Sequence, residues 1–255
     1  MRRLNDEVII VAGGATGIGA ETSRRLAEEG ARVVVGDINV AGAEETVAGI
    51  RDAGGEATAW TFDIADEESC AALVRAALDA YGDIAGLFNV AADLSAETLG
   101  RDTDLLSVPL EVWRRTLDVN LTGYLLTMRH TLPTLLERGG GSIVNTISGL
   151  VLNGDPNRPS YGAAKSAVIG LTRHVASRWG KEGIRCNAVA PGVVLTDSQL
   201  KAVSDEERER VSAILRSNRF GRPEDIAAMA TFLLSADGEW VNGQVYAVNG
   251  GAGLR

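Results

Sequence analysis

The sequence predicts an α/β fold, in which a doubly wound, mostly parallel sheet is covered by helices on both faces. Short apolar runs rich in β-branched residues alternate with segments of helical periodicity, and the connections between them are short. The chain has 255 residues, 45% of them hydrophobic, and no linker composition interrupts it. We therefore expect a single domain over residues 1–255.

The elements follow from the same pattern, taken in order. In the first part of the chain we expect strands at 7–13, 31–37, 56–63 and 84–91, separated by helices at 20–29, 40–53 and 66–81. Gly30 closes the first helix and Gly54-Gly55 the second, as glycines after a helix commonly do. Later come a helix at about 110–136, a strand at 142–148, a helix at 160–179 and a strand containing Cys186.

Charge and composition exclude several functions. The 25 Lys and Arg residues are outnumbered by 34 Asp and Glu, and no basic cluster follows Arg2-Arg3, so neither nucleic acid nor a membrane is an expected partner. No apolar run has the length of a signal peptide core or a membrane span, so we expect a cytoplasmic protein. Cys70 and Cys186 are expected to be buried thiols, and His130 and His174 lack partners at ligand spacing, so no metal site is predicted.

A glycine-rich turn, Gly13-Gly14-Ala15-Thr16-Gly17-Ile18-Gly19, lies where the first strand gives way to the first helix. Glycines there let backbone amides approach a pyrophosphate, which the positive end of the helix dipole also favours. Asp37 ends the second strand, where a carboxylate can bind the adenosine ribose hydroxyls and repel a 2′-phosphate. This pattern predicts NAD rather than NADP; the alternative is that the glycines serve only a tight turn.

A second constellation brings together Ser148, Tyr161 and Lys165. Tyr161 and Lys165 are four residues apart in a predicted helix, so their side chains share one face, one turn apart. A neighbouring cation favours the phenolate, which makes tyrosine a usable proton acceptor for an alcohol. Ser148, at the end of its strand, can hold the same substrate oxygen. The alternative is an ordinary pair on a helix surface.

With both constellations in place, the chain resembles the short-chain dehydrogenase/reductase family over nearly its full length. The segment 12–19 resembles the family's cofactor loop, although Ala12 replaces its usual threonine, and 89–92 stands where the family has Asn-Asn-Ala-Gly. The resemblance extends to Asp63-Ile64, Asn120, Pro191-Gly192, Thr196, and the carboxyl-terminal segments 222–227 and 248–251. It implies a Rossmann fold with a seven-stranded sheet.

The resemblance also implies roles for individual residues. Tyr161 is the acid/base, Lys165 lowers its pKa and holds the nicotinamide ribose, Ser148 orients the substrate oxygen, and Asn120 maintains a proton route behind Lys165. Asn120 is alternatively a structural amide that kinks its helix. The residues expected to contact NAD are Gly13, Thr16, Gly17, Ile18, Gly19, Asp37, Asp63, Ile64, Asn89, Ala91, Tyr161, Lys165, Pro191, Gly192, Val194 and Thr196.

The substrate pocket is expected between three segments, 93–108, 149–157 and 193–219, of which the last is predicted to be a lid with its own helix. Their leucines and valines favour a secondary alcohol or ketone on a hydrophobic or ring skeleton. Asp93, Asn153 and Arg158 are the polar candidates for reading a second group on the substrate.

The helices at 160–179 and 110–136 carry small or apolar residues on more than one face, which favours a homo-oligomer, and the family resemblance implies a homotetramer. We expect an NAD-dependent alcohol dehydrogenase or ketoreductase. Two alternatives stay open: an NADPH-type reductase of acyl thioesters or sugars with the same fold, and an NAD-binding sensor without turnover.

Overall fold

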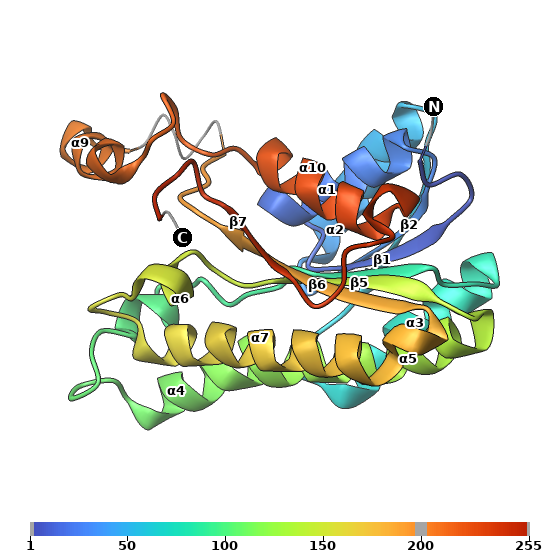
Figure 1. The fold of residues 1–255 in the computed structure, drawn as a ribbon, viewed down its shortest axis with the longest axis horizontal. Helices are drawn as coiled ribbons and strands as arrows, with labels where there is room; N and C mark the ends of the chain where they lie inside the picture. The colour runs from blue at the N-terminus through green and yellow to red at the C-terminus, as the bar shows by residue number, and fades with distance from the viewer. Residues whose placement is uncertain (1–2, 197–202, 254–255) are drawn as a thin grey trace.

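One parallel sheet forms the centre of the molecule. The computed structural model describes residues 3–196 and 203–253, and its sheet has seven strands in the order β3-β2-β1-β4-β5-β6-β7 (Figure 1). All six neighbouring pairs are parallel, so the predicted fold class is confirmed, with a sheet that is wholly rather than mostly parallel. The strands are β1 (Val8–Ala12), β2 (Arg32–Asp37), β3 (Glu56–Thr61), β4 (Gly86–Asn89), β5 (Gly141–Thr146), β6 (Ile184–Pro191) and β7 (Val245–Val248).

Two layers of helices cover the sheet. Figure 1 shows α1 (Gly17–Glu28), α2 (Val40–Asp52) and α10 (Pro223–Leu234) on one face, and α3 (Glu67–Tyr81), α4 (Leu110–Leu117), α5 (Gly123–Arg138) and α7 (Pro159–Trp179) on the other. The strands are apolar throughout because both of their faces are covered; every residue of β1 is buried. Two apolar cores result, one on each face of the sheet.

The order in which successive strands are added to the sheet reverses next to β1. This strand pairs with β2 on one side and with β4 on the other, so the crossovers wind outward in opposite directions from this point. A crevice forms at the carboxyl ends of strands where the order reverses, and ligands of such sheets bind there. The fold therefore assigns the site to the edge that carries the ends of β1, β2, β4 and β5.

Two helix predictions differ from the structure. The first helix begins at Gly17, three residues before the predicted Ala20, because Thr16 already has the extended backbone of a residue preceding a helix. The helix expected at about 110–136 is interrupted, since residues Asp118–Thr122 form a π-helical segment between α4 and α5. Such a segment is a local widening of the helix, and side-chain periodicity does not reveal it.

Shorter helices surround the carboxyl edge. Residues Leu150–Asn153 form α6 within the segment that was expected only as a pocket loop. The predicted lid range contains α9 (Asp205–Ile214), while residues 197–202 of that range lie outside the described residues. Figure 1 shows α9 standing apart from the helices that cover the sheet.

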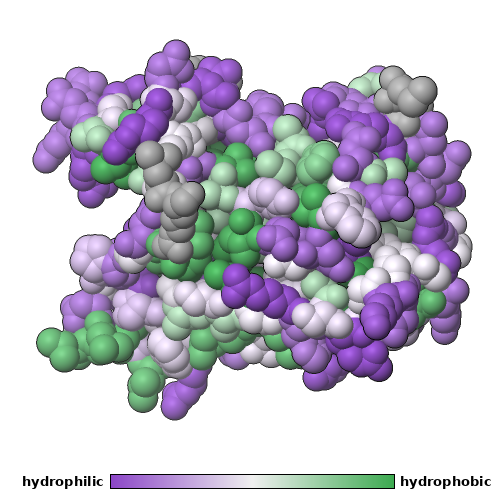
Figure 2. Space-filling model, viewed as in Figure 1, coloured by the Kyte–Doolittle hydropathy of each residue, from purple (hydrophilic) through white to green (hydrophobic). Residues whose placement is uncertain are grey.

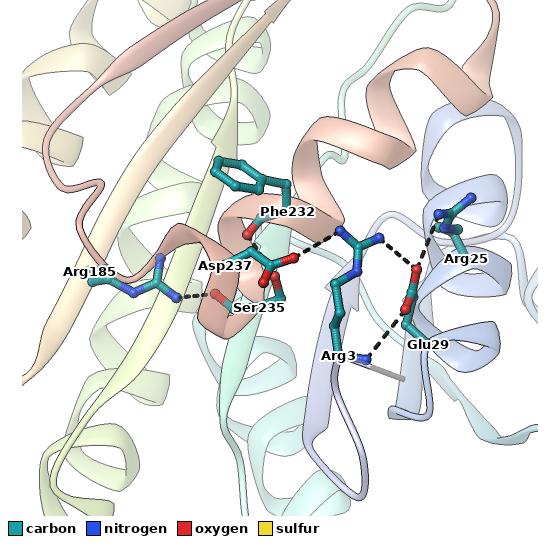
Figure 3. Close-up of polar contacts among 7 residues, drawn as sticks. All are labelled: Arg3, Arg25, Glu29, Arg185, Phe232, Ser235 and Asp237. Carbon is teal, nitrogen blue, oxygen red and sulfur yellow. Dashed lines mark hydrogen bonds and ion pairs between the residues drawn. The ribbon is translucent and has the colours of Figure 1, made fainter. Parts of the chain in front are cut away.

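At the opposite edge of the sheet, ion pairs attach the first residues to the body of the chain. Arg3 pairs with Glu29 at 2.6 Å and with Asp237 at 3.2 Å, and Glu29 also accepts from Arg25 (Figure 3). Arg185 donates to the carbonyl oxygen of Ser235 nearby. These contacts join the chain start, the end of α1 and the segment after α10.

Cys70 and Cys186 are buried free thiols, as expected, and burial raises the pKa of each to about 12. Among the described helices, none combines the length and the apolar character required to cross a membrane.

Candidate active site

The turn between β1 and α1 is shaped for close backbone approach. Gly13 has a φ of +107°, and a Cβ there would lie 2.5 Å from the backbone nitrogen of Ala91. At Gly17, which has a φ of +52°, a Cβ would meet no atom of the described residues within 4 Å. The first turn of α1 carries no acidic side chain, and Thr16 makes no side-chain capping bond. The helix start can therefore present its amides to a phosphate.

Asp37, the last residue of β2, stands beside this turn. One carboxylate oxygen accepts a 2.9 Å hydrogen bond from the Ala15 amide, and the other accepts one of the same length from Asn39. These bonds hold the carboxylate in one orientation at the mouth of the turn. Each oxygen keeps a further lone pair for a hydroxyl donor.

A cleft of about 830 Å³ opens above these residues, within the size range of ligand sites in proteins. Eleven of the predicted cofactor residues line it: Gly13, Thr16, Gly17, Ile18, Gly19, Asp37, Asp63, Ile64, Ala91, Val194 and Thr196. Asp63 orders its own loop, because its carboxylate accepts from the Ala65 amide at 2.9 Å. The shape, the free helix start and the placed carboxylate fit a dinucleotide.

Several lining residues were not predicted. Phe62, Arg115 and Val119 also face the cleft. Arg115 and Val119 are four residues apart, as two side chains on one helix face are, but nothing in the sequence indicates that this face meets the cleft. Arg115 forms an ion pair with Asp93 at 3.2 Å. Asp93 also accepts hydrogen bonds from the Ser95 and Thr98 hydroxyls. Asp93 is thus occupied by neighbouring donors.

The other five predicted cofactor residues, Asn89, Tyr161, Lys165, Pro191 and Gly192, lie outside this lining. Asn89 is fully buried; its amide donates to Asn145 at 2.9 Å, and its oxygen accepts from Thr127 at 2.8 Å. These bonds join β4 to β5 and α5. Pro191 and Gly192 instead approach the segments beside them: Gly149 donates to the Pro191 carbonyl at 2.8 Å, and a Cβ at Gly192 would lie 2.7 Å from the Cα of Asn249.

The structure brings Ser148 and Tyr161 together. Ser148 lies two residues beyond β5, and Tyr161 lies in the first turn of α7, where the Ser148 hydroxyl is near enough to the phenol to act on its pKa. Burial of the phenol raises the pKa of Tyr161, and this effect outweighs the opposite effects of the Arg158 charge and the Ser148 hydroxyl. The net direction is opposite to the lowering expected from the spacing of Tyr161 and Lys165.

Lys165, whose charge was expected to lower the pKa of Tyr161, is itself buried. Its side chain is only 1% exposed, and burial lowers the pKa of its ammonium to about 7. The nitrogen lies 5.8 Å from the centre of the Tyr161 ring, but its hydrogen bonds go to the Tyr124 hydroxyl at 2.9 Å and the Thr146 carbonyl at 3.0 Å. The amine therefore lies inside the protein and near Tyr161, as predicted. Its burial makes the charged ammonium form less favourable than it would be in water.

Asn120 lies in the π-helical segment and is fully buried. Its amide nitrogen donates to the Thr116 carbonyl at 3.2 Å, while its side-chain oxygen has no hydrogen-bond partner among the described residues. A buried amide oxygen without a donor is costly, which makes it a candidate binding point for a water molecule. The hydrogen bond from the Asn120 amide to the Thr116 carbonyl is a local contact within the helix, as expected if Asn120 has only a structural role.

Two residues around this site were missed. Asp102 is 2% exposed, and its carboxylate accepts from the Ser160 and Tyr161 amides, at 3.1 and 2.9 Å, and from the Ser160 hydroxyl at 2.8 Å. It holds the first turn of α7 from a loop 58 residues earlier. Tyr124, on α5, contacts Lys165 as described above. Neither contact has a local sequence pattern, because both join distant segments.

The expected substrate segments border a recess. Figure 2 shows a hollow between the part containing α9 and the layer containing α4 and α7, with hydrophobic residues gathered at its inner end. Leu94 lines the cleft and is 61% exposed, whereas Leu200 lies outside the described residues. Arg158 forms an ion pair with Asp155.

Known proteins resemble this chain over nearly its whole length. Residues 13–253 match the family model described as enoyl-(acyl carrier protein) reductase. The chain is 34% identical over 251 residues to 7alpha-hydroxysteroid dehydrogenase of Bacteroides fragilis, covering 98% of this chain and 96% of that protein. It is 40% identical over 254 residues to 2,5-dichloro-2,5-cyclohexadiene-1,4-diol dehydrogenase of Sphingobium indicum, covering 98% of each.

A solved structure agrees with these matches. A 7 alpha-hydroxysteroid dehydrogenase complexed with NADH and 7-oxo glycochenodeoxycholic acid is similar to this chain with a TM-score of 0.90 and 33% identity, over 98% of this chain and 95% of the other. Fold, motifs and relatives agree: the chain belongs to the short-chain dehydrogenase/reductase family and is an oxidoreductase with a cleft for a nicotinamide cofactor.

Proposed function

We propose that this protein is an NAD-dependent dehydrogenase that interconverts a secondary alcohol and a ketone on a hydrophobic ring. The observation that carries the proposal is the group formed by Ser148, after the carboxyl end of β5, and by Tyr161 and Lys165 near the start of α7. The Ser148 hydroxyl lowers the pKa of the nearby Tyr161 phenol, and the Lys165 nitrogen lies 5.8 Å from the centre of the Tyr161 ring. Such a group suits the movement of a proton to or from a carbinol oxygen.

In this mechanism Tyr161 exchanges the proton. Its phenolate takes the hydroxyl proton of an alcohol, and its phenol returns a proton to the oxygen of a ketone. Ser148, whose hydroxyl acts on the pKa of Tyr161, orients the substrate oxygen between the two side chains. A bound nicotinamide ring supplies the hydride chemistry, which belongs to the cofactor. Gly13, Gly17 and Asp37 are proposed to hold the cofactor's pyrophosphate and ribose.

Positive charge around Tyr161 favours its phenolate. Arg158 lowers the pKa of Tyr161 by its charge, against the larger effect of burial. Lys165 adds a second positive charge whenever it is protonated, and its pKa of about 7 means that this charge varies within the neutral range. Asn120 is proposed to carry a proton route behind Lys165 through its unpartnered side-chain oxygen.

Asp37 is the proposed basis of a preference for NAD over NADP. A carboxylate beside the adenosine ribose accepts from its hydroxyls and repels a 2′-phosphate. Replacement of Asp37 with Asn keeps the side-chain shape and removes the charge, so it should lower the ratio of kcat/KM for NAD to that for NADP by about tenfold. Asp52→Asn, an exposed residue at the end of α2 outside the cleft lining, is a matched control and should keep the wild-type ratio. An unchanged ratio in Asp37→Asn would refute the assignment.

A ring substrate is supported from two directions. The two relatives described above are named for steroid and cyclohexadiene-diol substrates. The hydrophobic residues at the inner end of the recess in Figure 2 suit an apolar skeleton. The range 193–219, which contains α9, is proposed to cover the bound substrate as a lid.

The test is turnover with defined substrates. Purified protein is incubated with NAD or NADP and a panel of cyclic and linear secondary alcohols, and formation of the reduced cofactor is followed by its absorbance. We expect the highest kcat/KM with NAD and cyclic alcohols. Activity confined to NADPH with acyl thioesters or sugars would support the alternative reductase, and tight NADH binding without turnover would support a sensor.

We also propose a homotetramer that uses the outer faces of α7 and of α4 with α5. Leu105 and Leu106, just before α4, and Leu110, its first residue, are exposed, at 77%, 98% and 63%, and an assembly would cover such residues. Light scattering after gel filtration should give four times the mass of one chain. The mass of a single chain would refute this.

A further inference from the structure

Lys165 has a partner that the family resemblance did not point to. Tyr124 is fully buried, and its hydroxyl oxygen accepts a 2.9 Å hydrogen bond from the Lys165 ammonium. The Lys165 nitrogen also lies 4.3 Å from the centre of the Tyr124 ring, a distance at which the ring face attracts a cation. Tyr124 thus contacts the lysine both through its oxygen and through its ring.

A buried ammonium depends on such contacts. Water no longer solvates Lys165, and of its three N–H donors the described contacts use two, one to Tyr124 and one to the Thr146 carbonyl. Two tyrosine rings lie near the Lys165 nitrogen, that of Tyr124 at 4.3 Å and that of Tyr161 at 5.8 Å from the ring centre, and Arg158 acts on Tyr161 by its charge. The Tyr124 oxygen is therefore the side-chain acceptor for the cation.

The other side of Tyr124 faces the cofactor cleft. Its hydroxyl proton is donated to the carbonyl of Ala91 at 3.2 Å, and Ala91 lines the cleft. Burial raises the pKa of Tyr124 well above its usual range, so this proton stays in place. The Ala91 amide is in turn bonded to the Ala12 carbonyl at 2.8 Å, at the end of β1. A continuous chain of hydrogen bonds thus runs from the cofactor turn through Tyr124 to Lys165.

We propose that Tyr124 is a positioning residue of the active site, whose hydroxyl oxygen holds the Lys165 ammonium in its charged form beside Tyr161 and against the wall of the cofactor cleft. Tyr124 acts only through Lys165 and does not itself contact the reacting atoms. The effect on catalysis rests on the function proposed above, whereas the contact between the two side chains does not.

Replacement of Tyr124 with Phe tests this. The ring remains, but Lys165 loses its side-chain acceptor, so its pKa should fall further below about 7. With less positive charge near Tyr161, the apparent pKa for alcohol oxidation should rise by about one unit, and kcat at neutral pH should fall about tenfold. The KM for the alcohol should stay within about twofold, because substrate contacts are untouched.

Tyr81→Phe is the matched control. Tyr81 lies at the opposite edge of the sheet, where its ring faces Arg32, the first residue of β2, at 5.6 Å. This variant should reproduce the wild-type pH profile. If Tyr124→Phe also keeps the wild-type kcat and pH profile, the proposal is wrong.

A second measurement does not need turnover. The lysines of the chain are Lys165, Lys181 and Lys201, so NMR of protein labelled at the lysine Cε can follow Lys165 alone once Lys165→Arg assigns its signal. The pKa of Lys165 should be lower in Tyr124→Phe than in the wild type; an equal value would overturn the proposal even if no alcohol is turned over.

Should the variant fail to fold, the wild-type protein allows a third measurement. The Tyr124 Cζ signal must shift at the midpoint of the Lys165 titration, and a signal that does not follow this titration would equally refute the contact.

Discussion

At the scale of single residues, the chemistry of the site depends on the pKa of Tyr161, which determines whether its phenol is protonated. Burial raises the pKa of this phenol, while Arg158 and Ser148 act in the opposite direction with smaller effect. A phenol with a high pKa is protonated at neutral pH, so it can supply a proton there, and it becomes an acceptor only as the pH rises. The two directions of the reaction should therefore differ in their dependence on pH.

The predicted pH dependence follows from that sign. Alcohol oxidation needs the phenolate, so its kcat/KM should rise about tenfold per pH unit below the pKa of Tyr161. Ketone reduction needs the phenol, so its kcat/KM should stay flat in this range and fall only above that pKa. Rate measurements in both directions from neutral to alkaline pH check this. An oxidation rate that falls toward alkaline pH while the fold persists would contradict it.

At the scale of elements, the start of α7 is held by a loop far away in the chain. The nearly fully buried Asp102 carboxylate accepts hydrogen bonds from the Ser160 and Tyr161 backbone amides and from the Ser160 hydroxyl. The first amides of a helix lack partners within the helix, so a buried carboxylate there stabilises both the helix and the position of Tyr161.

We predict that Asp102→Ala lowers the free energy of unfolding by about 2 kcal/mol, because buried donors lose their acceptor, and lowers kcat about tenfold. Ser160→Ala is the matched control, since it removes only the hydroxyl bond and leaves both amide bonds. Urea unfolding and steady-state kinetics of the two variants measure the effects. Equal, small changes in both variants would show that Asp102 does not position α7.

The same element shows how far sequence reasoning reaches. The positions of Gly13, Asp37 and Ser148 at strand ends could be predicted, because apolar strands and glycine turns are local patterns and parallel strands end at a common edge. Asp102 and Tyr124 could not, since their contacts bridge 58 and 41 residues and depend on packing. The π-helical segment around Asn120 was also missed, because one widened turn leaves the hydrophobic periodicity almost unchanged.

The expected protonation of Tyr161 failed for a related reason. Helical spacing correctly places Lys165 one turn from Tyr161, but it carries no information about solvation. Complete burial lowers the pKa of Lys165 to about 7 and raises that of Tyr161. The sign of such a balance emerges only when the surrounding side chains are in place.

At the scale of the whole molecule, the active site lies at the carboxyl ends of the strands, and the stabilising contacts of Arg3 and Glu29 lie at their amino ends. Arg3 and Glu29 lie away from the cleft, and the Arg3 hydrogen bond lowers the pKa of Glu29 to about 2 (Figure 3). Because the folded-state pKa is below the ordinary 4.5, this pair stabilises the fold above pH 4.5, and the stabilisation is lost as the pH falls through 2.

Glu29→Gln should therefore lower the free energy of unfolding at neutral pH by about 1 kcal/mol, a small value because the pair is partly exposed to solvent. The difference from the wild type should shrink as the pH falls below 4.5, and kcat should not change. Urea unfolding at several pH values measures this. A difference that persists unchanged in acid, or a loss of activity, would contradict the separation of the two edges.

The central claim is that the Tyr161 hydroxyl moves the proton while the cleft binds the cofactor independently. The most direct test compares Tyr161→Phe with the wild type, using kcat for a cyclic secondary alcohol and the Kd for NADH measured by fluorescence. Loss of only the hydroxyl should lower kcat at least a thousandfold, near the general acid–base contribution of about 10²–10⁴, and leave the Kd within about threefold. Retained turnover in Tyr161→Phe would contradict the account.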